Sequence, residues 1–310
     1  MSEWKKNLKK KKRVFLPLFF VLVIIVIVLG IRISQDIAEK QNIRPAKEVR
    51  DYSPELSDIQ AKSFYVYDVT ENKVLFAKNE HEQLPLASIT KLMSGLIIAT
   101  NLPSTSTVTI SKADIESGEG SNGLFVGEKW DIKNLLNFSL IMSSNSGIYA
   151  LARTLDESRG INSSTTLDLM NAKAKILGLT NTIFFNETGL DINASTSGAY
   201  SSSYDVTMLL NKILSSYPML TSETIEDAAS FISESNMRHI AINTNTAINE
   251  IPGLIASKTG YTDLAGGNLV IAFDAGVMHP VIAVVLGSTE EGRFTDMERL
   301  VHVTLEKLSD

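Results

Sequence analysis

The chain has no cysteine among its 310 residues. Disulfides and thiolate metal sites are therefore excluded. A chain without cysteine is compatible with export into an oxidising space, where it would fold without disulfide bonds, but the composition alone does not demonstrate export. The chain has only four histidines, which show no ligand spacing: His81, His239, His279 and His302. We therefore expect neither a metal nor another cofactor.

Internal repeats and low-complexity tracts are also lacking, so 310 residues are enough for one or two ordinary domains. The charge is unevenly placed. The first thirteen residues carry a net charge of +6, whereas the whole chain carries −6, so the remainder carries −12. An acidic body argues against nucleic acid as a partner.

One long run without charge follows the basic start, with the sequence VFLPLFFVLVIIVIVLGI over residues 14–31. Its length suits a helix that spans a bilayer, and no small-x-small cleavage site follows it. We therefore expect a transmembrane anchor at 14–32 rather than a cleaved signal peptide, which is the alternative. The basic flank predicts a cytoplasmic tail at 1–13 and an extracytoplasmic catalytic domain.

Residues 33–60 are polar, mixed in charge and contain Pro45 and Pro54. They are expected to form a tether between the membrane and a folded domain at 61–310. That domain has β-rich runs near both ends, at 63–69, 73–77, 254–259, 268–273 and 281–286. Helical patterns lie between and after them, at 132–155, 165–177, 204–214 and 294–308. The order predicts one sheet formed from both ends of the chain and covered by helices, with a helical insertion.

Three short motifs carry the chemistry, and the first is Ser88-x-x-Lys91. At this spacing both side chains lie on one helix face, so the lysine can act as base for the serine hydroxyl. Apolar residues after Lys91 predict partial burial of its amine, which would lower its pKa. Taken alone, the motif also fits an ordinary surface helix.

The second motif, Ser143-x-Asn145, interrupts the helical pattern at 143–147 and offers a proton relay and a carboxamide for a substrate. Plain helix capping is the alternative. The third, Lys258-Thr259-Gly260, ends a strand. On an edge strand, a glycine lets a substrate backbone pair alongside. An ordinary strand-to-turn junction is the alternative.

In this order the three motifs resemble the penicillin-recognising serine enzymes. Their flanks narrow the resemblance to the serine D-alanyl-D-alanine carboxypeptidases, the low-molecular-mass penicillin-binding proteins, over roughly residues 60–310. The flanks are Leu86–Met93, Thr188–Leu190, Ser201–Asp205, Asn243–Asn245 and Ser257–Gly266. The resemblance implies an α+β fold like that of β-lactamases, with a mainly antiparallel sheet flanked by helices and an all-helical subdomain.

The resemblance also implies a role for each matching residue. Ser88 would be the acylated nucleophile, Lys91 its base and Ser143 the proton relay. Substrate would be held by Asn145, Lys258 and Thr259, and its carboxylate by Arg293 of a Gly-Arg pair. The backbone N–H groups of Ser88 and Tyr261 would form the oxyanion hole. A helix-start arginine exposed to solvent is the alternative for Arg293.

The sequence departs from the family in two places. Ser146 stands where an aspartate often follows Ser-x-Asn, and the chain stops soon after its last helical pattern, without the C-terminal β-rich domain of larger members. The expected activity is hydrolysis of the terminal D-Ala-D-Ala bond of peptidoglycan stem peptides through a Ser88 acyl-enzyme, with β-lactams as inhibitors.

Two alternatives remain open. A class A β-lactamase-like hydrolase needs a glutamate in a Glu-x-x-Leu-Asn loop, and the nearest stretch here is Glu187-Thr188-Gly189-Leu190-Asp191. A catalytically idle penicillin-binding module is the other. A β-lactam sensor would need a signalling domain across the membrane, where only thirteen residues are expected.

Overall fold

The computed structural model describes residues 52–160 and 163–309. The compact unit begins at Tyr52, which is earlier than the predicted boundary at Ala61. A short helix, α2 (Ser53–Ser57), lies at its start, and the N–H groups of Gln60 and Ala61 donate to the Asp296 carboxylate. The predicted anchor and the first part of the tether lie outside the described residues. Within the described ranges, no helix has the length and apolar character needed to cross a membrane.

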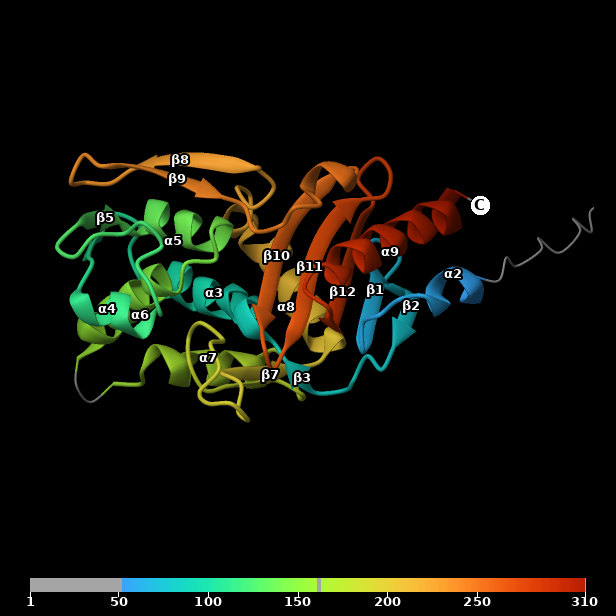
Figure 1. Cartoon of the computed structure of the whole chain (residues 1–310), viewed down its shortest axis with the longest axis horizontal. Helices are drawn as coiled ribbons and strands as arrows, with labels where there is room; N and C mark the ends of the chain where they lie inside the picture. The colour runs from blue at the N-terminus through green and yellow to red at the C-terminus, as the bar shows by residue number, and fades with distance from the viewer. Residues whose placement is uncertain (1–51, 161–162, 310) are drawn as a thin grey trace, which may run out of the picture. The chain divides into compact units, whose positions relative to one another are not determined.

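A five-stranded antiparallel sheet forms the centre of this unit, with the order β10-β11-β12-β1-β2 (Figure 1). Its strands are β1 (Ser63–Asp68), β2 (Lys73–Lys78), β10 (Leu254–Thr262), β11 (Gly266–Asp274) and β12 (Pro280–Ser288). Both ends of the folded unit therefore contribute strands to one sheet, which confirms the sequence prediction for the domain. β10 is an edge strand, so one side of its backbone has no neighbouring strand in this sheet.

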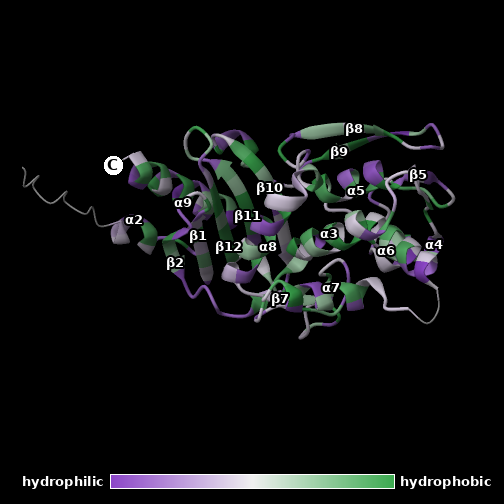
Figure 2. Ribbon diagram, turned by 180° about the vertical axis from the view of Figure 1, so that it is seen from behind, coloured by the Kyte–Doolittle hydropathy of each residue, from purple (hydrophilic) through white to green (hydrophobic). Residues whose placement is uncertain are grey.

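Helices cover both faces of the sheet, α9 (Gly292–Ser309) on one and α8 (Ser203–Ser216) on the other (Figures 1 and 2). Side chains of β12 alternate between the two layers, as the period of a strand requires. Ile282, Val284 and Leu286 join one hydrophobic cluster, and Val281, Ala283 and Val285 join the other. Because the unit holds two clusters of its own, it has the cores of an independent domain.

The second part of the unit is mainly helical. Its helices are α3 (Lys91–Asn101), α4 (Lys112–Ser117), α5 (Ile132–Ile141), α6 (Asn145–Arg159) and α7 (Thr166–Ile176), with 3-10 turns η1 (Ala87–Thr90), η2 (Pro218–Leu220) and η3 (Ile248–Glu250). Short strands accompany these helices. The prediction of an all-helical subdomain is therefore wrong in this detail. The strands are β3 (Leu84–Pro85), β4 (Thr107–Thr109), β5 (Lys129–Asp131), β6 (Ile183–Phe184), β7 (Ala199–Ser201), β8 (Ala228–Ile232) and β9 (Arg238–Ile242).

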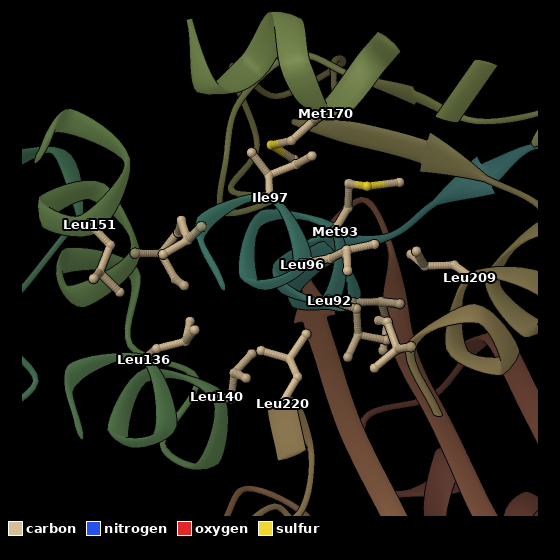
Figure 3. Packing of buried hydrophobic residues seen from close by; sticks show 14 of the residues in the cluster. Leu92, Met93, Leu96, Ile97, Leu136, Leu140, Leu151, Met170, Leu209 and Leu220 are labelled. Carbon is tan, nitrogen blue, oxygen red and sulfur yellow. The ribbon is translucent and has the colours of Figure 1, made fainter. Parts of the chain in front are cut away.

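Helix α3 lies at the centre of this part. All residues from Lys91 to Ile98 are buried, and a helix with no exposed face over that length belongs inside a core. Figure 3 shows its apolar side chains directed to different neighbours, among them Leu136, Leu140, Leu151, Met170, Leu209 and Leu220. The packing fixes α3, and with it the turn that carries Ser88.

Candidate active site

Ser88 lies in the turn η1, immediately before α3, and its side chain is half-buried. The turn has an unusual backbone, because Ala87 has φ +48°. Gly189 packs against it with φ +81°, and a Cβ on Gly189 would lie 1.9 Å from the Ala87 carbonyl oxygen. Only glycine therefore permits this approach, which holds the serine turn in place.

The Lys91 amine is fully buried and lies 2.6 Å from Ser88 Oγ. It also donates to the Thr188 carbonyl oxygen at 3.2 Å. Burial, and then the charge of Lys258, lower the pKa of Lys91 well below its usual 10.5. A neutral amine at hydrogen-bond distance from a hydroxyl can accept its proton. The predicted pairing and the predicted burial of Lys91 are thus both observed.

Ser143 and Lys258 form a second hydroxyl–amine pair, in which Lys258 Nζ donates to Ser143 Oγ at 2.9 Å. Ser143 connects α5 to α6 and has φ +59°. Lys258 extends from β10 with 2% of its surface exposed and donates to the Thr259 carbonyl oxygen at 3.0 Å. Burial, and then the charge of Arg293, lower the pKa of Lys258 to about 7. The second and third motifs therefore meet, although 115 positions separate these two residues.

Asn145 and Thr259 adjoin these pairs. The Thr259 carbonyl oxygen accepts from Lys258 Nζ, whereas the side chains of both residues bond elsewhere. Asn145 is the first residue of α6, and its Nδ2 donates to the Gly118 carbonyl oxygen at 3.4 Å. Its Oδ1 accepts no hydrogen bond from the described residues. Thr259 Oγ1 lies 2.5 Å from Thr244 Oγ1. Both side chains contribute polar groups beside the two lysines.

Arg293 is the second residue of α9 and is buried, with 7% of its surface exposed, so it is not the solvent-exposed arginine of the alternative interpretation. Its Nη1 donates to the Gly260 carbonyl oxygen at 3.1 Å, and its guanidinium lies 4.6 Å from the centroid of the Phe294 ring. Its Nε has no partner among the described residues, and burial lowers its pKa. A buried guanidinium with unused donors suits an anionic group.

The edge strand β10 packs directly against the serine turn at Gly260. A Cβ on Gly260 would lie 3.1 Å from the backbone nitrogen of Ser88 and 2.7 Å from the Leu86 carbonyl oxygen. Tyr261 follows on the same strand, with 43% of its surface exposed. The two backbone segments expected to form the oxyanion hole are therefore adjacent.

Asn268 is a buried residue of this site that we did not single out from the sequence. From β11 it donates to the carbonyl oxygens of Pro85 and Leu86, at 2.9 and 3.0 Å, and accepts from the Gly287 N–H at 2.8 Å. It thereby attaches the serine turn to the sheet. A single asparagine without a local motif gives no sequence signal for such a long-range contact.

Comparisons with known proteins agree with this geometry. A family model described as D-alanyl-D-alanine carboxypeptidase matches residues 48–290. D-alanyl-D-alanine carboxypeptidase DacF of Bacillus subtilis is 32% identical over 250 residues, which cover 79% of this chain and 60% of DacF. The chain thus spans less than two thirds of that relative's length.

Two solved structures have similar folds. The D-alanyl-D-alanine carboxypeptidase of Mycobacterium tuberculosis H37Rv is 26% identical with a TM-score of 0.71, covering 86% of this chain and 96% of that one. Ampicillin-bound penicillin-binding protein D2 of Listeria monocytogenes is 25% identical with a TM-score of 0.66, covering 79% and 98%. By the match over residues 48–290, the chain belongs to the D-alanyl-D-alanine carboxypeptidase family.

Proposed function

We propose that this chain is a serine D-alanyl-D-alanine carboxypeptidase that removes the terminal D-alanine from peptidoglycan stem peptides. The observation that carries the proposal is the buried Lys91 amine, 2.6 Å from Ser88 Oγ and with a lowered pKa. Family membership supplies the reaction class. The site residues keep the roles predicted from the sequence.

In the acylation step, Ser88 Oγ attacks the carbonyl carbon of the penultimate D-alanine while Lys91 accepts the hydroxyl proton. The N–H groups of Ser88 and Tyr261 stabilise the oxyanion. Breakdown of the tetrahedral intermediate cleaves the C–N bond. Ser143 passes its hydroxyl proton to the departing amine and takes up the proton that Lys91 accepted, so Lys91 is again a neutral amine. Lys258, which donates to Ser143 Oγ, supports that transfer.

In the deacylation step, water attacks the Ser88 ester and gives a proton to Lys91. The ester C–O bond breaks and Lys91 returns its proton to Ser88 Oγ. The shortened peptide forms as a carboxylic acid and loses its remaining proton to solvent. The step needs no cofactor, because water and two side chains supply all atoms and protons.

Substrate would lie along β10 as an added strand, since this edge of the sheet has no neighbouring strand. Arg293 and Thr259 would bind the terminal carboxylate, with Lys258 adding positive potential. Asn145 would accept a substrate N–H at Oδ1, which lacks a partner among the described residues. β-Lactams carry a reactive carbonyl and a carboxylate, so we propose that they acylate Ser88 and inhibit the enzyme; the related Listeria protein has been solved in an ampicillin-bound form.

The proposal places the enzyme at a cell membrane, with 1–13 as cytoplasmic tail, 14–32 as single-pass anchor and residues from 33 to the start of the folded unit as tether. The uncharged run and its basic flank support this arrangement. Treating intact spheroplasts with protease tests it, because an extracytoplasmic domain is digested without lysis. Survival of the domain until lysis would overturn the orientation.

Glu187 does not favour a class A β-lactamase mechanism. It lines a pocket of about 310 Å³ between α4 and α6, together with residues such as Tyr149 and Asp156, and neither Ser88 nor Lys91 lines this pocket. Burial raises the pKa of Glu187. Its backbone carbonyl oxygen accepts a hydrogen bond from Ser94 Oγ on α3.

One assay separates the three interpretations. The protein is incubated with a peptide ending in D-Ala-D-Ala and, separately, with a fluorescent penicillin. Released D-alanine with slow turnover of the label supports the carboxypeptidase. Rapid label hydrolysis without D-alanine indicates a lactamase, and retained label without D-alanine indicates a binding module.

A further inference from the structure

A pocket of about 460 Å³ lies at the end of α3 remote from Lys91. The end of α3, the start of α5 and the segment 216–220 form its walls. A volume of this size falls in the range of small-molecule sites. Ala99, which lines it, is eight residues beyond Lys91, so a rise of 1.5 Å per residue places it roughly 12 Å along the helix. The pocket is therefore separate from the active site.

The walls of the pocket are mostly apolar. Leu102, Ile132, Leu136, Pro218 and Leu220 line it. Met219 also lines it, with 67% of its surface exposed. Apolar surface lining an open hollow remains in contact with water, and burying it against an apolar ligand is favourable. The body of an occupant is thus apolar.

The one charged side chain among the lining residues is cationic, and the Glu223 carboxylate beside the lining already accepts a hydrogen bond from Asn137 Nδ2. Lys133 is the only Lys, Arg, Asp or Glu among the lining residues, and it is exposed. It lies in the first turn of α5, whose N-terminus is capped by the Asp131 side chain. Ser104 and Tyr217 are also among the lining residues. We propose that this pocket binds a small amphiphilic anion, a carboxylate or sulfonate with a compact apolar body, whose charge meets Lys133.

Residues of the pocket wall, and residues that follow them in the chain, contact α3 and β10, the elements that carry Lys91 and Lys258. Leu220 packs over α3, where a Cβ on Gly95 would lie 3.4 Å from Leu220 Cδ1 (Figure 3 shows Leu220 beside α3). The next turn holds Thr224, which accepts from the Ser257 N–H at 3.0 Å through its hydroxyl. A ligand here would bind the folded chain and not the unfolded one, so it would raise the unfolding midpoint.

The test uses residues 52–310, which have their own cores, and 8-anilinonaphthalene-1-sulfonate as the probe. We expect a saturable one-site rise in fluorescence that decanoate competes away. Decyltrimethylammonium, with an equal chain and the opposite charge, should compete at least tenfold less well. The Ser88→Ala variant should bind the probe as well as the parent.

Two variants locate the site. Ala99→Phe adds a ring at an exposed helix position that lines the pocket. It should weaken probe binding at least tenfold and leave penicillin acylation unchanged. If Ala99→Phe fails to fold, Ser216→Trp fills the same space. Lys133→Glu should weaken binding at least threefold, whereas Lys129→Glu, an equal charge change outside the pocket, should not. Unchanged binding in the filled variants, or equal competition by the cationic amphiphile, would overturn the proposal.

Discussion

Lys258 Nζ donates a hydrogen bond to Ser143 Oγ at 2.9 Å, although the two residues come from a sheet edge and from the junction between two helices. This contact joins the sheet to the helical part of the domain beside Ser88. It turns three separate motifs into one site with two hydroxyl–amine pairs. Both lysines are buried, and burial is the main cause that lowers the pKa of each.

Replacing Lys91 by methionine should abolish most of the chemistry without unfolding the protein. A general base contributes about 10²–10⁴-fold, so we expect Lys91→Met to slow acylation by fluorescent penicillin by that factor. Stability should not fall, because methionine removes a buried amine whose charged form burial disfavours. Stopped-flow labelling and urea unfolding measure the two effects. Acylation at the parent rate would exclude Lys91 as the base.

The depressed pKa of Lys258 should give stability a pH dependence. The pKa is about 7 in the folded chain, against the usual 10.5 of a lysine, so between these values the unfolded chain holds a proton that the folded chain has lost. Stability from this group therefore rises with pH across the window, by the order of 1 kcal/mol per unit.

Urea unfolding from pH 7 to 10 checks this expectation. Lys258→Met should reduce the slope and leave the part due to buried Lys91, whereas Lys129→Met, at an exposed strand position, should leave the slope unchanged. Equal slopes in the parent and in Lys258→Met would show that Lys258 titrates normally.

Gly189 should be intolerant of a side chain. Gly189→Ala would place a Cβ 1.9 Å from the Ala87 carbonyl oxygen at φ +81°, so overpacking and backbone strain together should cost about 2–5 kcal/mol. Gly178→Ala is the matched control, with φ +71° and no atom within 4 Å, and should cost about 1–2 kcal/mol. Denaturant unfolding measures both, and equal losses would mean that the contact with Ala87 is unimportant.

Arg293 should act on the free carboxylate of the substrate. Losing a charged hydrogen bond costs about 1.5–3 kcal/mol, so Arg293→Gln should raise KM for a D-Ala-D-Ala peptide by roughly 10–100-fold. Amidating the C-terminal carboxylate of the peptide should raise KM of the parent enzyme to a similar degree. The same change should hardly raise KM of Arg293→Gln any further. Steady-state D-alanine release gives these values, with thermal unfolding as the check on folding. Independent, additive losses would assign Arg293 another role.

The sequence was enough to predict which side chains form the site, but not the backbone conformations and long-range contacts that position them. Helical spacing was enough to pair Ser88 with Lys91, and the strand patterns at both ends were enough for the main sheet. Nothing local predicts the positive φ of Ser143, which places its hydroxyl near Lys258, since serine seldom adopts that conformation. The same holds for Asn268, whose contacts with Pro85 and Leu86 span more than 180 positions. The β8–β9 hairpin also escaped prediction.

The central claim is that Ser88 is a nucleophile activated by Lys91, and intact-protein mass spectrometry tests it most directly. After incubation with benzylpenicillin, the protein should gain the mass of one penicilloyl group, and peptide mapping should place it on Ser88. The Ser88→Ala variant should gain nothing while remaining folded. An adduct on another residue, or a folded parent protein that forms no adduct with benzylpenicillin and releases no D-alanine from a D-Ala-D-Ala peptide, would contradict the account.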